Sequence, residues 1–227
     1  MKIRQATLET CSEATGTVIA IDVIRAFTTA AFAFAAGVRD IVLVGEVEEA
    51  LALRQRMPGS LVMGEVSGLR PEGFDYGNSP SALVGLDLSG RRLIQRTSAG
   101  TQGIVRSRRA EVLLASSFVC ASATVRHLQR QSPESVTFVV TGVFPGVNGD
   151  EDAACADYLA ALLRGESPNI APFVQRVRDS SEGHFFDEAP PRSPLSDLEC
   201  CLSVDRFDFA MVVERRNGLM VMEAQSA

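Results

Sequence analysis

Charged and polar residues gather at four points in the sequence where a short apolar run ends. At the first, Asp22 closes the run Thr17–Asp22, and Arg25, Thr28 and Thr29 follow. A buried carboxylate is costly without a cation, so Asp22 suits Mg²⁺ ligation or nucleophilic attack. The guanidinium of Arg25 and the amides of a helix N-terminus suit a phosphate. An Asp N-cap followed by a surface arginine would explain the same residues without any function.

The second group follows the apolar run Leu61–Gly64 and begins with Glu65. The loop after it contains Gly73-Phe74-Asp75-Tyr76-Gly77-Asn78-Ser79-Pro80, in which Asn-Ser-Pro is typical of a helix start. One interpretation is a loop shaped around a ligand, with Glu65 or Asp75 as a metal ligand or base and Asn78 and Ser79 at the substrate. The other is a solvent loop rich in turn-forming residues.

The third group, 96–103, follows another apolar run and contains Thr97, Ser98, Gly100 and Thr101. Small residues let backbone amides converge on an anion, and the hydroxyls add donors. The segment has no lysine and is not a Walker phosphate loop. An ordinary turn between a strand and a helix is the alternative.

The fourth group lies between an apolar run and a helical pattern, from Thr141 to Asp152. Its glycines are spaced GxxxGxxG, which differs from the GxGxxG of a dinucleotide-binding fold. Glu151 and Asp152 either stabilise a helix N-terminus through its dipole or complete a magnesium site, where the metal cancels their repulsion.

One segment imitates a catalytic motif. Cys120 and Arg126 have the C-x5-R spacing of cysteine phosphatases, but no glycine lies between them, and the apolar spacing predicts a helix. Cys120 is therefore interpreted as structural, and Ser116 and Ser117, at a strand end, are the better site candidates. His127 and His184 are interpreted as surface or packing residues.

Composition limits the chemistry further. The 227 residues carry a net charge of −6, which disfavours nucleic acid and anionic membrane surfaces as partners. Lys2 is the only lysine, and there are two histidines. Metal and carboxylate chemistry is therefore favoured over lysine or histidine chemistry. Five cysteines without a CxxC pair and no signal-peptide pattern predict a cytoplasmic protein, and a homodimer is the base-rate expectation.

Short apolar runs alternate with helical patterns, which predicts a layered α/β/α fold with a mixed, largely parallel sheet. We expect one phosphatase-like domain over residues 1–227, or two closely packed halves with a break near 165–195. Residues 165–195 are expected to form an irregular arm with a short helix. Asn217-Gly218 between two apolar runs predicts a C-terminal hairpin, placed at an antiparallel edge of the sheet. The predicted strands are Thr17–Asp22, Ile41–Val44, Leu61–Gly64, Arg92–Arg96, Val112–Ala115, Val136–Val140, Phe207–Glu214 and Leu219–Glu223. The predicted helices are Arg25–Ala36, Val47–Met57, Phe118–Gln129 and Asp152–Arg164.

Taken in order, the four groups resemble the 2-phosphosulfolactate phosphatase family. The resemblance rests on Ile21-Asp22-Val23-Ile24-Arg25-Ala26 with Thr28-Thr29, Gly64-Glu65, Phe74-Asp75-Tyr76-Gly77-Asn78-Ser79-Pro80, Thr97 through Gly100-Thr101, Ser116 and Glu151-Asp152. It covers Thr17 to Ala160 well and the last third loosely. The sequence departs from the family pattern at Phe27, Ala99 and Thr141, where Thr, Asn and Cys are usual.

The resemblance implies Mg²⁺-dependent hydrolysis of 2-phospho-3-sulfolactate to 3-sulfolactate and phosphate, a step toward coenzyme M. On this hypothesis Mg²⁺ is held by Asp22 with Glu65 or Asp152, and Arg25 neutralises charge, aided by Thr28 and the segment from Ser98 to Thr101. Asp75 or Glu151 orients the attacking water, or Asp22 attacks directly. Arg70 and Arg96 are further cations for the substrate. The alternatives are a phosphatase for another small 2-phospho-carboxylic acid and a non-catalytic anion-binding protein.

Overall fold

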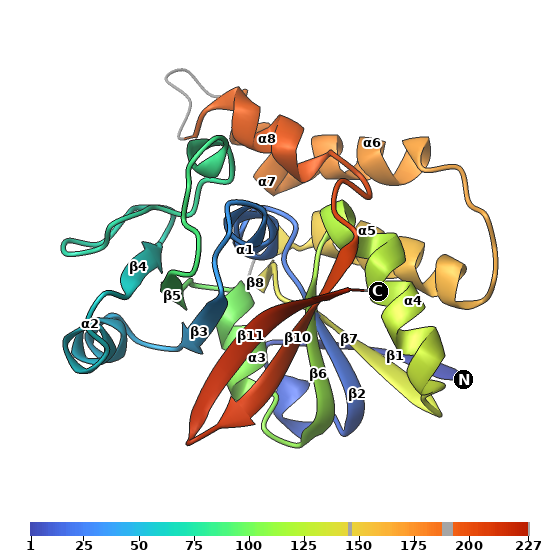
Figure 1. Cartoon of the computed structure of the whole chain (residues 1–227). Helices are drawn as coiled ribbons and strands as arrows, with labels where there is room; N and C mark the ends of the chain where they lie inside the picture. The colour runs from blue at the N-terminus through green and yellow to red at the C-terminus, as the bar shows by residue number, and fades with distance from the viewer. Residues whose placement is uncertain (145–146, 188–192, 227) are drawn as a thin grey trace.

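The computed structural model describes residues 1–144, 147–187 and 193–226, and these contain a nine-stranded mixed sheet in the order β1-β7-β2-β6-β10-β11-β3-β5-β4 (Figure 1). The predicted α/β layered fold is confirmed. The strands of this sheet are β1 (Lys2–Thr7), β2 (Gly16–Ile21), β3 (Asp40–Val44), β4 (Leu61–Gly64), β5 (Arg92–Arg96), β6 (Ala110–Ser116), β7 (Ser135–Val140), β10 (Phe209–Arg216) and β11 (Leu219–Ser226). A separate short pair consists of β8 (Val143–Phe144) and β9 (Val147–Asn148).

The α-helices of the described residues lie between and after these strands. They are α1 (Ala26–Ala35), α2 (Val47–Arg56), α3 (Gly100–Arg106), α4 (Ala121–Gln131), α5 (Asp150–Leu163), α6 (Ala171–Asp179), α7 (Ser181–His184) and α8 (Leu195–Cys201). Short 3-10 turns form η1 (Cys11–Glu13), η2 (Ser81–Leu83) and η3 (Phe118–Cys120). None of these helices is long and apolar enough to cross a bilayer.

The C-terminal hairpin lies in the middle of the sheet, not at its edge as the sequence suggested. Strand β10 pairs antiparallel with β6, placing Met211 opposite Ala115, and β11 pairs antiparallel with β3, placing Met220 opposite Leu43. The turn residues specify a hairpin, but the strands beside it are chosen by tertiary packing. The hairpin joins two parallel blocks, β1-β7-β2-β6 and β3-β5-β4.

Strand β1, helix α3 and the short pair β8–β9 were not predicted. Strand β1 has the polar sequence KIRQAT and is largely exposed beside β7, so it lacks the apolar run used to recognise buried strands. Helix α3 has only seven residues and begins in the Gly-containing segment 96–103, which was interpreted as an anion site with an ordinary turn as the alternative. Residues 165–195 contain more helix than the one short helix expected, since α6 and α7 lie there and α8 begins at Leu195; this segment together with α8 is called the arm.

Helix α1 lies almost wholly inside the protein. Nine of its ten residues are buried, and its sequence consists of small alanines alternating with phenylalanines and threonines. It packs in one core with residues of both parallel blocks, including Val18 and Ala20 of β2 and Ile41 of β3. The opposite faces of the two blocks pack on α4 and α5 and on α2 respectively, which explains why the strands are apolar on both sides.

Sheet twist brings the ends of the two blocks together. The antiparallel hairpin makes the β3-β5-β4 block run opposite to the β2-β6 block within the sheet. Neighbouring strands rotate by about 20–25° each, so the steps from β2 to β4 accumulate roughly 120–150°. The sheet therefore wraps around α1 (Figure 1), and the carboxyl ends of β2 and β4 face the same pocket.

Candidate active site

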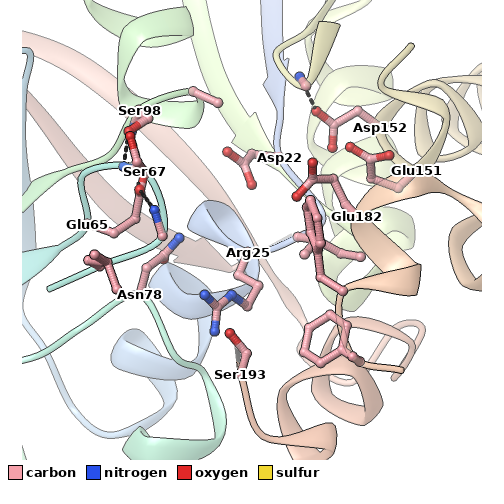
Figure 2. Close-up of a pocket in the computed structure, with 17 residues that line it drawn as sticks. Asp22, Arg25, Glu65, Ser67, Asn78, Ser98, Glu151, Asp152, Glu182 and Ser193 are labelled. Carbon is pink, nitrogen blue, oxygen red and sulfur yellow. Dashed lines mark hydrogen bonds between the residues drawn. The ribbon is translucent and has the colours of Figure 1, made fainter. Parts of the chain in front are cut away.

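A pocket of about 460 Å³ lies where the carboxyl ends of β2 and β4 meet the start of α5 and the arm that contains α7. Figure 2 shows Glu151, Asp152 and Glu182 on one side and Glu65, Ser98 and Asn78 on the other, with Asp22 and Arg25 between them. Its described lining is Asp22, Ile24, Arg25, Glu65, Ser67, Gly68, Leu69, Asn78, Ser98, Ala99, Gly142, Glu151, Asp152, Glu182, Phe185, Phe186 and Ser193.

Asp22 is fixed by the start of α1. Its Oδ1 accepts a hydrogen bond of 2.7 Å from the Ala26 N–H, while Oδ2 lies on the side of Gly100. A Cβ at Gly100 would come within 2.7 Å of that oxygen, so a residue without a side chain is needed there. Burial raises the pKa of the Asp22 carboxyl to about 7, and the carboxylate of Glu65 adds to the rise.

Asp152 lies close to Asp22, as their distances to one shared threonine hydroxyl show. The Thr141 hydroxyl is 3.3 Å from Asp152 Oδ2 and 3.5 Å from Asp22 Oδ2. Asp152 also accepts hydrogen bonds from the Val23 N–H at 2.8 Å and the Gly142 N–H at 2.9 Å. Burial, followed by the charge of Glu151, raises the pKa of Asp152 well above its ordinary value.

Glu151 is the least satisfied carboxylate of the site. It is 2% exposed, and its Oε2 has no hydrogen-bond partner among the described residues. A Cβ at Gly142 would lie 2.5 Å from Glu151 Oε1 and 3.3 Å from Asp152 Oδ2, so this glycine leaves room for both acids. Burial raises the pKa of Glu151 to about 7, with further contributions from Glu182 and Asp22.

The donor chemistry of these three acids fits a hard cation. In the described part of the chain, Asp22, Glu151 and Asp152 make no ion pair with a basic side chain. No three His, Cys, Asp or Glu side chains of that part are already arranged to enclose a metal ion. Mg²⁺ does not require such a cage, because it is usually bound by one or two carboxylates together with water and substrate phosphate. The raised pKa values and the unpartnered Glu151 Oε2 therefore fit Mg²⁺.

Glu65 lies across the pocket and organises two loops. Its carboxylate accepts hydrogen bonds from the Ser98 N–H at 2.5 Å and the Gly68 N–H at 2.6 Å, and the Ser98 hydroxyl is 3.2 Å away. Both oxygens therefore already serve local backbone donors. Glu65 lines the pocket with Asp22 and Asp152, and its charge contributes to the raised pKa of Asp22, so its predicted part in holding a metal stays a prediction.

Among the described residues that line the pocket, Arg25 is the only arginine. Its Nη1 donates a hydrogen bond of 2.5 Å to Asp197 Oδ2, and its side chain is 12% exposed. The guanidinium is thus held from one side and reaches the pocket from the other.

The family assignment follows from comparison with known proteins. The model of the family described as 2-phosphosulpholactate phosphatase matches residues 3–216, nearly the whole described chain. The chain belongs to this family. A probable 2-phosphosulfolactate phosphatase of Bacillus subtilis is 32% identical over 207 residues, covering 90% of each chain. One of Thermoplasma acidophilum, with the same description, is 26% identical over 208 residues, covering 92% of this chain and 90% of the relative.

Several residues predicted to act in the site lie outside this family member's pocket lining. Asp75 accepts a hydrogen bond from the Val62 N–H at 2.8 Å and pairs with Arg54, so it fastens its loop to β4. The Arg70 guanidinium donates to the Asp75 carbonyl oxygen. Arg96 donates to the carbonyl oxygens of Gly45 and Glu65. Of the three arginines predicted to bind the substrate, only Arg25 is in the described lining of the pocket.

Other predicted residues support the lining from behind it. The Thr28 hydroxyl donates to the Val23 carbonyl oxygen, and Ser116 is buried within 3.1 Å of the Thr124 hydroxyl. Thr97 and Thr101 each accept a hydrogen bond from the other's backbone N–H, which closes the turn before α3.

The remaining predicted contacts divide between the pocket and its support. The Ser79 hydroxyl donates to Asp197, whereas Asn78 and Ser98 line the pocket. The Asn78 side-chain oxygen is buried without a hydrogen-bond partner among the described residues. Gly100 leaves the space that Asp22 occupies without itself lining the pocket.

Sequence reasoning missed the contribution of the arm. Glu182 of α7, together with Phe185 and Phe186, lines the pocket, and Asp197 of α8 holds Arg25. The Pro- and Ser-rich composition of this segment indicated an irregular arm, and no spacing related it to Asp22. Only folding the arm across the carboxyl end of β2 brings these residues to the site.

The departures from the family pattern differ in their effect. Phe27 is fully buried in the core around α1 and does not line the pocket, whereas Ala99 does. Thr141 places its hydroxyl between Asp22 and Asp152. Of the departures at Phe27 and Ala99, only the one at Ala99 therefore alters the described wall of the pocket.

Proposed function

We propose that this protein is a Mg²⁺-dependent phosphatase that hydrolyses 2-phospho-3-sulfolactate to 3-sulfolactate and phosphate, as in coenzyme M biosynthesis. The observation that carries the proposal is the meeting of Asp22, Glu151 and Asp152 with Arg25 in one pocket. The family of the chain and the names of its relatives supply the substrate. In this proposal the relatives' described activity is extended to this chain.

Asp22, with Asp152 or Glu151, is the set of residues that would hold Mg²⁺. When bound, the ion would neutralise phosphoryl charge and polarise the phosphorus–oxygen bonds. Their proximity supports this role, since Asp22 and Asp152 approach the same threonine hydroxyl. Glu151 adds an unpartnered oxygen to the same side of the pocket.

Arg25 orients the phosphoryl group more than it adds net positive charge to the pocket. Its positive charge is already paired with Asp197, so its further N–H donors can bind phosphoryl oxygens without leaving the pocket strongly basic. Asn78 and Ser98 line the opposite wall and offer polar side chains to the sulfonate and carboxylate groups. The substrate carries several negative charges, which explains why the proposal requires a cation as well as Arg25.

Hydrolysis breaks the bond between phosphorus and the ester oxygen and forms a new bond between phosphorus and the oxygen of water. The water proton must be accepted, and the departing alkoxide oxygen must be protonated. Glu151 is suited to orient the water, because its buried Oε2 is an acceptor without a partner in the described chain and its pKa of about 7 suits proton exchange. In the alternative route Asp22 attacks phosphorus and forms an aspartyl phosphate that water then hydrolyses.

The test is phosphate release from 2-phospho-3-sulfolactate, phosphoglycolate and phospholactate, with Mg²⁺ and with EDTA. We expect the fastest Mg²⁺-dependent release from 2-phospho-3-sulfolactate and none in EDTA. Asp22→Asn should reduce the rate by about 10³-fold or more, since a preorganised charged group is lost. Asp40→Asn is the matched control, because Asp40 is also buried but pairs with Arg92 and does not line the pocket.

Each departure from the expected result removes a definite part of the proposal. Equal rates on all three substrates would contradict the named substrate and favour a general 2-phospho-carboxylic acid phosphatase. Full activity in EDTA would contradict the Mg²⁺ requirement. Ligand binding by calorimetry without any phosphate release would identify a non-catalytic anion-binding protein.

A further inference from the structure

Asp197 is a buried carboxylate on α8 that joins three segments distant in the sequence. Its side chain is 0% exposed. Oδ1 accepts hydrogen bonds from the Ser79 hydroxyl at 2.8 Å and from the Ser81 N–H and hydroxyl at 3.0 and 2.6 Å. Oδ2 accepts the Arg25 Nη1 donor at 2.5 Å. One carboxylate therefore connects the arm, the loop before η2 and the residue that precedes α1.

The pairing leaves one side of Arg25 directed to the pocket. Of the guanidinium's donors, Nη1 is the one with a hydrogen-bond partner in the described part of the chain. The side chain lines the pocket between the acidic wall and the wall formed by Asn78 and Ser98 (Figure 2). A guanidinium is planar and rigid, so fixing one nitrogen also fixes the plane in which the others point.

We propose that Asp197 is a positioning residue, which orients Arg25 so that its remaining N–H donors face an anionic group of the substrate. The inference rests on the proposed function for the identity of that group as phosphate. Asp197 does not itself touch the substrate, because all of its described hydrogen bonds join it to Arg25, Ser79 and Ser81. Its action is through Arg25, and the arm that carries it thereby becomes part of the active site.

The experiment is a double-mutant cycle on phosphate release with Arg25→Gln, Asp197→Asn and both changes together. Each single change should lower kcat/KM by about 10- to 100-fold, as is usual when a partner of a functional group is lost. If Asp197 acts through Arg25, the double variant should be no slower than the slower single variant. Losses that multiply would show an independent structural role and overturn the proposal.

Two variants separate positioning from stability. Asp40→Asn breaks a buried Asp–Arg pair outside the pocket, so we expect a lower Tm with unchanged kcat/KM. Ser81→Ala removes one hydroxyl donor from Asp197 Oδ1 and keeps the Arg25 pair, so it remains informative if Asp197→Asn does not fold. We expect Ser81→Ala to lower kcat/KM about fivefold, the loss of one hydrogen bond. If Asp197→Asn does not fold, an unchanged kcat/KM in folded Ser81→Ala would by itself overturn the proposal.

Binding of inorganic phosphate, measured by calorimetry with Mg²⁺ present, tests the same inference without turnover. Wild-type protein and Asp40→Asn should bind phosphate equally, and Asp197→Asn about tenfold more weakly. If the protein shows no phosphatase activity but its phosphate binding still depends on Asp197, the proposed function is rejected and the positioning role stands. If the wild-type protein releases phosphate normally, but neither phosphate binding nor kcat/KM changes in Asp197→Asn, the proposed function stands and the positioning role is rejected. A wild-type protein that neither binds nor releases phosphate would reject both the proposed function and the positioning role.

Discussion

Gly100→Ala tests whether the position of the Asp22 carboxylate controls activity. The added Cβ would lie 2.7 Å from Asp22 Oδ2 and 2.7 Å from the Ala26 Cβ, about 0.7 Å inside the 3.4 Å at which ordinary contact begins. Asp22 cannot turn away freely, because its Oδ1 is held by the Ala26 N–H at 2.7 Å. The carboxylate and the start of α1 must therefore shift together.

The expected cost has two parts. Overpacking a buried site destabilises a protein by about 1–3 kcal/mol, which lowers Tm. A misplacement of a functional group approaching 1 Å lowers rate by about 10²-fold. We expect Gly100→Ala to reduce Mg²⁺-dependent kcat/KM by about 10- to 100-fold at a temperature where the variant remains folded.

Gly45→Ala is the matched control for this prediction. Gly45 also lies after a strand and lacks a positive φ, but a Cβ there would meet only side chains at 3.8 Å or more. The entropic gain in the unfolded chain is the same for both changes, so the comparison isolates the clash. Wild-type kcat/KM and Tm in Gly100→Ala would refute the reasoning, because the carboxylate would then be free to move or unnecessary.

Two further predictions concern Glu151 and Asp75. In EDTA the free energy of unfolding should fall as pH rises from 4.5 to about 7, because Glu151 binds its proton more tightly in the folded than in the unfolded state. Urea unfolding across that pH range should show a smaller fall in Glu151→Gln than in the wild-type protein. An equal fall in both proteins would contradict the raised pKa of Glu151. Asp75→Asn should lower the free energy of unfolding by about 1–3 kcal/mol, because it weakens the hydrogen bond that Asp75 accepts from the Val62 N–H. We expect kcat/KM to stay at the wild-type value. A large loss of kcat/KM in a folded variant would show that Asp75 takes part in the reaction.

Local sequence was sufficient for most of the elements. Strands such as Leu61–Gly64 and Arg92–Arg96 have the predicted bounds, because apolar residues that are buried on both faces leave a continuous run in the sequence. Polar β1 and short α3 left no such pattern. The helix predicted from Phe118 instead begins as the 3-10 turn η3 and becomes α-helical at Ala121.

The candidate site was predictable to the extent that strand ends carry function. Asp22 and Glu65 were identified because each stands at the end of an apolar run, and Asp152 because it opens the helical pattern that follows another such run; all three line the pocket. Asp75 has the same residue type in an equally polar loop, yet it fastens the loop outside the pocket. Residue type and spacing cannot distinguish these cases, because the direction of a loop side chain depends on what the loop packs against.

By itself, the sequence determined the chemistry open to this protein: carboxylates and arginine, with a single lysine and two histidines. It also determined the alternation of strands and helices, because burial and period are properties of neighbouring residues. Only the tertiary structure decided which of those residues meet. The central hairpin and the accumulated twist bring Glu65 across the pocket from Asp22, and the arm adds Glu182 and Asp197. Such contacts join residues far apart in the chain, so the packing of the whole fold selects them.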